Sequence, residues 1–129
     1  MPAGERRPFD ELIADLDPDL IAAARRLREL VFEVDPHTVE IIRLRSRTAT
    51  YGVGAHETSE GYVYVRPFVR WVSLGFYQGT HLDDPEGLLE GTDPVLRHLK
   101  VATFHSAKQP ATRSLIEEAV SERRTTLGI

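Results

Sequence analysis

The sequence predicts an α+β fold, with a small antiparallel sheet of about four strands and helices packed mainly on one face. Apolar residues recur at helical spacing near both ends of the chain, whereas apolar and polar residues alternate in its middle. A short connection joins the strand patterns at 62–66 and 70–77, which indicates an antiparallel hairpin. Helices that come before and after the strands are typical of a sheet with its helices on one face.

Length and composition limit the class of protein. A chain of 129 residues with 41% hydrophobic content is long enough for one core, so we predict a single domain over 1–129 with 1–8 as a flexible leader. The absence of cysteine excludes disulfides, thiol nucleophiles and thiolate metal sites. A net charge of −4 disfavours nucleic acid as a general partner. No apolar run is long enough to cross a membrane, so we expect no membrane partner and a cytoplasmic location.

Helical signals occur in five segments, and strand signals in four. The main helix begins at Asp17-Pro18, because Asp17 is a good N-cap and proline fits the first helical position. Asp84-Pro85 gives the same signal for a short helix that ends at Gly91. The expected helices are 9–16, 17–34, 37–44, 84–91 and 110–124, and the expected strands are 48–51, 62–66, 70–77 and 97–104.

Aromatic residues on the strands are the main candidates for ligand binding. If the helices cover the face that bears Val72 and Leu74, the tyrosines and the tryptophan stand on the other face, near Arg66. The candidates are Tyr51, Tyr62, Tyr64, Arg66, Trp71 and Tyr77. Two alternatives stay open, namely that this face packs under the loop at 52–61 or forms a homodimer interface.

Two further groups carry chemistry. Arg97 and His98 together suit an anion, although Arg97 is also expected to pair with a carboxylate of the segment 83–90. The candidate metal ligands are His81, Asp83, Asp84 and Glu86, a set of hard donors suited to iron, magnesium or calcium and not to a closed zinc site. The same carboxylates also suit helix capping and solvent-exposed charge.

A resemblance to a known family rests on three runs of residues. They are RTATYGVG at 47–54, SEGYVYV at 59–65 and VSLGFYQGTHLDDPEGLLEGTDPVLRHLKV at 72–101. In this order they resemble the YdhG-like family, small bacterial domains of undefined function, over about 20–125. The resemblance implies an α+β domain with a small sheet and flanking helices. Some members are described as frataxin-like iron chaperones, so the resemblance allows iron binding, although the residues themselves indicate no cofactor.

The chain departs from the family after Gly91-Thr92. Many members have a Gly-Lys or Gly-Lys-Gly step there, whereas this sequence has Asp93-Pro94-Val95. The change removes a cation and flexible backbone, which disfavours an anion site at that turn.

The function expected from the sequence is a binding or accessory module for a small ligand or a protein partner, with no chemistry of its own. No spacing in the sequence fixes a nucleophile beside its base, and no G-x-S-x-G elbow occurs. A frataxin-like iron chaperone and an unrecognised enzyme are the alternatives.

Overall fold

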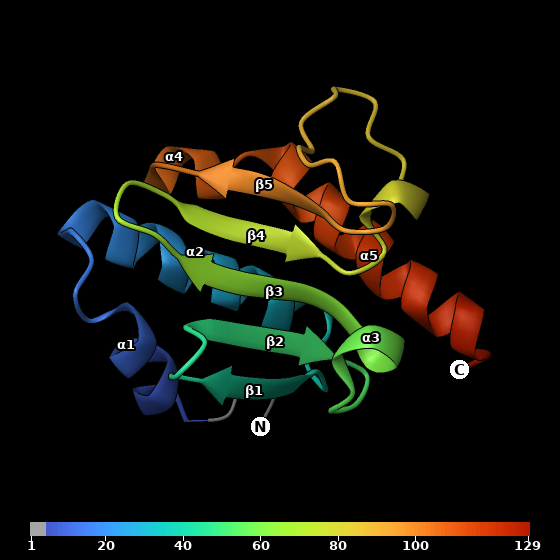
Figure 1. The fold of residues 1–129 in the computed structure, drawn as a ribbon, viewed down its shortest axis with the longest axis horizontal. Coiled ribbons are helices and arrows are strands. Elements are labelled where there is room, and N and C mark those ends of the chain that lie inside the picture. Colours follow the sequence, from blue (N-terminus) through green and yellow to red (C-terminus); the bar gives the residue numbers. More distant parts are fainter. Residues whose placement is uncertain (1–4) are drawn as a thin grey trace.

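A computed structural model describes residues 5–129, which form a five-stranded antiparallel sheet in the order β1-β2-β3-β4-β5 (Figure 1). The strands are β1 Val39–Arg43, β2 Thr48–Gly52, β3 Gly61–Pro67, β4 Val72–Phe76 and β5 Arg97–Val101. The helices are α1 Arg7–Ile13, α2 Pro18–Val34, α3 Glu57–Glu60, α4 Phe104–Ala107 and α5 Pro110–Leu127, with a 3₁₀ turn η1 at Gly79–His81. The predicted α+β class is confirmed.

The two long helices, α2 and α5, lie side by side behind the sheet (Figure 1). α2 begins at the predicted Asp17-Pro18 step, although the Asp17 side chain makes no capping hydrogen bond. α5 ends at Gly128, whose φ of 72° is left-handed backbone that glycine adopts without strain. The leader predicted at 1–8 falls partly outside the described residues, and Arg7 and Pro8 already belong to α1.

The core lies between these helices and one face of the sheet. Val65 of β3 pairs with Leu74 of β4, which pairs with Leu99 of β5. Val65 and Leu74 are completely buried, as are Leu27 and Ile116 of the covering helices. Burial of such side chains is worth about 1.5–3 kcal/mol each, so this layer fixes which strand residues face away from the helices.

The helix predicted at 37–44 is wrong, because these residues form β1, an edge strand that pairs with β2. Val39, Ile41 and Ile42 are β-branched and suit a strand, and a short apolar run cannot be assigned from periodicity alone. The chain turns back at 44–47, with Arg47 at a φ of 54°. The sheet of the described residues therefore has one strand more than predicted.

The helix predicted at 84–91 is also wrong. The Asp84 carboxylate accepts hydrogen bonds from the backbone N–H groups of Leu88 and Leu89, both at 2.9 Å, but the backbone turns instead of continuing as a helix. Gly87 and Gly91 both have positive φ, at 65° and 129°. Asp84 therefore caps backbone N–H groups as its sequence position indicated, but the residues that it caps form a turn. The strand expected to reach 104 ends at Val101.

Candidate functional site

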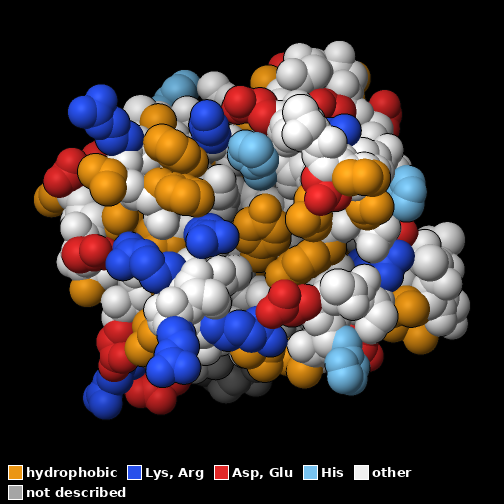
Figure 2. Space-filling model, in the orientation of Figure 1, with side chains coloured by type: hydrophobic (Ala, Val, Ile, Leu, Met, Phe, Trp, Pro, Cys, Tyr) orange, Lys and Arg blue, Asp and Glu red, His pale blue; other side chains and the backbone are white. Residues whose placement is uncertain are grey.

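The face of the sheet that points away from α2 and α5 is the candidate site, and we call it the open face. Figure 2 shows this face in the orientation of Figure 1, with hydrophobic side chains and the side chains of Lys and Arg lying over the strands. Strand register defines its two central rows. One row runs Thr50, Tyr64, Gly75 and His98, and the next contains Arg66, Ser73 and Lys100.

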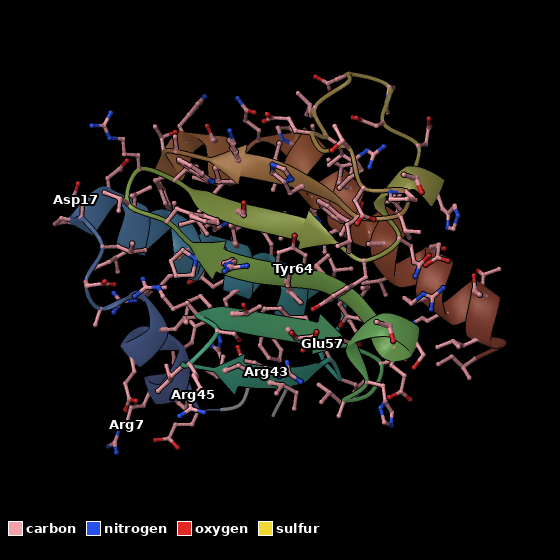
Figure 3. All side chains as sticks on the ribbon, viewed as in Figure 1. Arg7, Asp17, Arg43, Arg45, Glu57 and Tyr64 are labelled. Carbon is pink, nitrogen blue, oxygen red and sulfur yellow. The ribbon has the colours of Figure 1, made fainter. Side chains whose placement is uncertain are left out.

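The ring of Tyr64 lies directly on Gly75 of the neighbouring strand. A Cβ atom at Gly75 would stand 1.8 Å from Cζ of Tyr64, so only glycine leaves room for the ring. An aromatic side chain over a cross-strand glycine supplies the packing that glycine lacks. Tyr64 is half-buried, and Figure 3 places it near the centre of the sheet. The ring therefore covers the backbone with one side and keeps part of its surface outward.

Tyr77 packs against Tyr64 and is held by a polar network. The two ring centroids are 5.3 Å apart with an interplanar angle of 56°. Thr50 Oγ1 lies 3.1 Å from the Tyr77 hydroxyl and accepts a 3.0 Å hydrogen bond from Arg43. Arg43 in turn pairs with Glu57 of α3 at 2.9 Å (Figure 3). Burial raises the pKa of Tyr64 and of Tyr77, so both remain neutral hydrogen-bonding groups at neutral pH.

A second aromatic group stands at the β3–β4 turn. Phe68 and Trp71 stack with centroids 4.9 Å apart and an interplanar angle of 22°. The Arg66 guanidinium lies 5.6 Å from the Phe68 centroid, and the Lys100 ammonium lies 4.9 Å from the Trp71 ring. The indole Nε1 of Trp71 is buried without a hydrogen-bond partner among the described residues. Cations therefore already rest on both rings of this pair.

Positive charge is concentrated at this end of the sheet. Within residues 5–129, Arg66 forms no ion pair, and Lys100 has only a 3.9 Å contact with Glu90. Arg45 and Arg70, in the adjacent turns, likewise form none with the described residues. A pocket of about 420 Å³ opens beside Arg66 and Phe68, and the carboxylates of Asp15 and Asp17 also line it. In a chain of net charge −4, this clustering favours an anionic partner at the open face.

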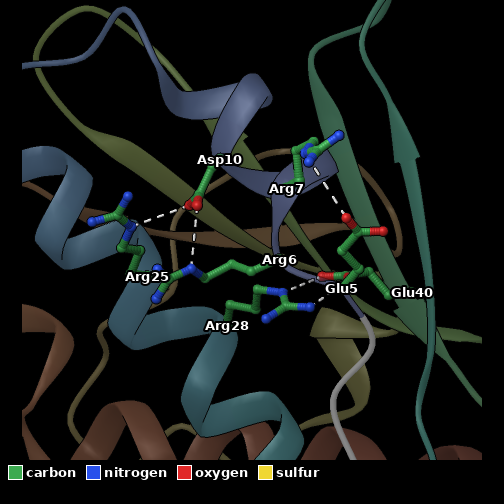
Figure 4. A network of polar contacts seen from close by, with 7 residues as sticks. All are labelled: Glu5, Arg6, Arg7, Asp10, Arg25, Arg28 and Glu40. Carbon is green, nitrogen blue, oxygen red and sulfur yellow. Dashed lines mark hydrogen bonds and ion pairs between the residues drawn. The ribbon is translucent and has the colours of Figure 1, made fainter.

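Tyr51 does not belong to the open face. It is fully buried on the helix side, where its hydroxyl donates to Glu40 at 2.8 Å. Glu40 also accepts two hydrogen bonds from Arg28 of α2, at 2.6 and 2.9 Å (Figure 4). The prediction was wrong because alternation along β2 turns Thr50 outward and Tyr51 inward.

Tyr62 is also buried, contrary to prediction, and is only 1% exposed. Tyr51 pairs with Val63 and Gly52 pairs with Gly61, so Tyr62 is an extra residue in the ladder. Such a bulge interrupts the alternation of side chains. The Tyr62 hydroxyl hydrogen-bonds Thr38 and, at 3.1 Å, Asp35, which gives this tyrosine a structural role.

Arg97 and His98 separate onto opposite sides of β5. Arg97 pairs with the core residue Phe76, and its guanidinium donates to the backbone carbonyls of Asp93 and Leu96. The expected ion pair of Arg97 with the segment 83–90 is therefore wrong. His98 lies opposite Gly75 on the open face, as predicted from alternation.

The predicted metal ligands are divided between two pockets that share Asp83. Asp83, Asp84 and Glu86 line a pocket of about 230 Å³ against α5, and His81 and Asp83 line a neighbouring one of about 370 Å³. Among residues 5–129, no three histidine or carboxylate side chains gather closely enough to hold a metal ion. Iron binding stays a prediction.

Lys100 was expected beside the Arg97-His98 candidate, and it shares its face with His98 because it alternates with Leu99. Two other residues of the open face escaped prediction as binding residues. Arg43 was hidden by the helix predicted at 37–44, and nothing in the sequence places Phe68 on Trp71.

No family model matches this chain, and no curated protein or solved structure is significantly similar to it. The resemblance to the YdhG-like family therefore stays a prediction. No helix of the described residues is long and apolar enough to span a membrane.

Proposed function

We propose that this protein is a YdhG-like binding module without chemistry of its own, and that its open face receives an anionic partner. The observation that carries the proposal is the arrangement around Tyr64, where an aromatic ring laid on Gly75 stands beside cations that lack strong ion pairs. Surfaces that combine aromatic rings with arginine are typical of binding sites.

The hydrogen bonds of the open face favour binding over catalysis. A nucleophilic site needs a hydroxyl or thiol within hydrogen-bond reach of a base that a third group orients. On this face the network runs from Glu57 through Arg43 and Thr50 to Tyr77. It holds a ring in place and contains no histidine, which is the arrangement expected of a preorganised contact surface.

Immobilised heparin tests the proposal, because it presents dense anionic charge without aromatic bases. We expect the protein to be retained at low salt despite a pI of about 5.7, and Arg66→Gln/Lys100→Gln to elute at clearly lower salt. The control Arg25→Gln/Arg113→Gln removes the same charge from exposed ion pairs on α2 and α5. Failure of the native protein to bind, or an equal shift in the control, would contradict the proposal.

A further inference from the structure

We propose that the occupant of the open face is a single-stranded nucleic acid, an inference that rests on the proposed function and names the partner's class. Bases would stack on the exposed parts of Tyr64 and Phe68. The two cations that rest on the Phe68–Trp71 pair in the free protein would contact phosphates. A binding surface of this kind combines aromatic platforms with a positively charged track along the backbone.

The order of residues along β4 supports this assignment. Gly75 of β4 lies under the Tyr64 ring, and Trp71, the residue before β4, stacks on Phe68. The two positions are four residues apart, or about 13 Å in an extended chain. Ser73 lies between them, flanked by Arg66 of β3 and Lys100 of β5. The face therefore presents ring, cations and ring in sequence across the middle of the sheet.

Exposed ring surface favours an unpaired strand over other polyanions. In a duplex the bases stack on each other and their faces are covered, so Tyr64 would find nothing to stack on. The carboxylates of an acidic peptide would satisfy Arg66 and Lys100 but would leave the rings without a stacking partner. Single-stranded bases use both features, and stacking tolerates any base sequence because every base has a π-face.

The charge of the whole chain sets limits on this binding. A net charge of −4 opposes phosphate binding to the molecule as a whole, so binding must depend on the cations at this end of the sheet. Affinity should consequently fall steeply with salt and depend on few residues. The slope of log K against log salt should become shallower by about 1.4 when Arg66 and Lys100 are neutralised, at roughly 0.7 for each lost phosphate contact.

Fluorescence anisotropy with a labelled oligothymidylate tests the inference, with an abasic strand carrying the same number of phosphates as the comparison. We expect the native protein to bind the oligothymidylate about tenfold or more tightly than the abasic strand. Tyr64→Leu should lose about tenfold for the oligothymidylate and leave abasic binding unchanged. Arg66→Gln/Lys100→Gln should weaken both, whereas Arg25→Gln/Arg113→Gln should weaken neither.

Phe68→Ala provides a second variant, since Phe68 is 37% exposed and its removal leaves the core intact. It should also weaken oligothymidylate binding selectively.

The inference would be overturned if the native protein bound the abasic strand, duplex DNA or polyglutamate as tightly as it binds the oligothymidylate. Equal binding of polyglutamate would indicate an acidic protein partner. If the protein is retained on heparin but binds oligothymidylate no more tightly than the abasic strand, only the nucleic-acid assignment fails. If neither binds, the proposed function fails with it.

Discussion

Glu118 of α5 is an unusual carboxylate, because one of its oxygens is buried and accepts no hydrogen bond from the described residues. Its Oε2 has no hydrogen-bond partner among the described residues, and it lines the pocket against Asp83 and Asp84. Burial, followed by the charge of Asp83, raises the pKa of Glu118. The folded protein thus binds this proton more tightly than the unfolded chain does.

This raised pKa predicts a pH-dependent effect of Glu118→Gln. The contribution of Glu118 to the free energy of unfolding increases as the pH falls through the pKa that Glu118 has in the folded protein. The increase is complete below the pKa of the unfolded chain, which is near 4.5. The amide carries no charge to bury, so the variant should be more stable than the native protein at neutral pH. That advantage should shrink as the pH approaches 4.5 in urea denaturation.

Glu117→Gln is the matched control, because Glu117 is exposed on the same helix and pairs with Arg113. It should give no stabilisation at neutral pH. A stability advantage of Glu118→Gln that stays constant with pH would mean that burial of the ionised carboxylate is not what destabilises the native protein.

At the level of elements, the pairing of β3 with β4 depends on Tyr64 and Gly75 fitting together. Alanine normally suits a strand interior better than glycine. Here Gly75→Ala should destabilise the protein by about 1–3 kcal/mol, because the new methyl group displaces the Tyr64 ring. Chemical denaturation of the variant measures this free energy.

A double-mutant cycle isolates the contact. In a Tyr64→Ala background the ring is absent, so Gly75→Ala should cost far less. Ser73→Ala serves as a control on the same side of β4. An undiminished cost in the Tyr64→Ala background would show that the strain lies in the backbone and not in the ring.

Long periodic elements could be predicted from the sequence, and short ones could not. The helices α2 and α5 and the alternation of β4 follow from many residues that agree, so single exceptions do not matter. The run that forms β1 has five residues and fits two structures equally well in isolation. Its pairing with β2 decides the outcome, and pairing is not a local property.

The candidate site was predicted only in part for a related reason. Tyr64 reaches the open face because alternation holds along β3 after the bulge. Trp71, Tyr77 and His98 reach it because alternation holds along β4, its flanking residues and β5. A bulge removes Tyr62 from that face, and bulges leave no reliable signal in one sequence. The ring of Tyr64 over Gly75 is a cross-strand contact that only the register reveals.

For the molecule as a whole, the sheet and both long helices meet at Asp35, just after α2. This carboxylate is 3% exposed, pairs with Arg124 of α5 at 3.1 Å and accepts a hydrogen bond from Tyr62 of β3. A buried charge is tolerated only when such partners replace its water. The junction therefore ties the end of the chain to the middle of the sheet.

Tyr62→Phe tests this junction. Loss of the hydroxyl leaves Asp35 with one partner fewer in a buried site, and hydrogen bonds to charged groups are worth about 1.5–3 kcal/mol, so we expect a loss of stability of that size. Tyr64→Phe is the matched control, because its hydroxyl has no hydrogen bond within the described residues, and it should change stability by less than about 0.5 kcal/mol. Urea denaturation of both variants gives the comparison. If Tyr62→Phe lost as little stability as Tyr64→Phe, Asp35 would be held by Arg124 and the backbone alone. Tyr62 would then contribute only its ring to the core.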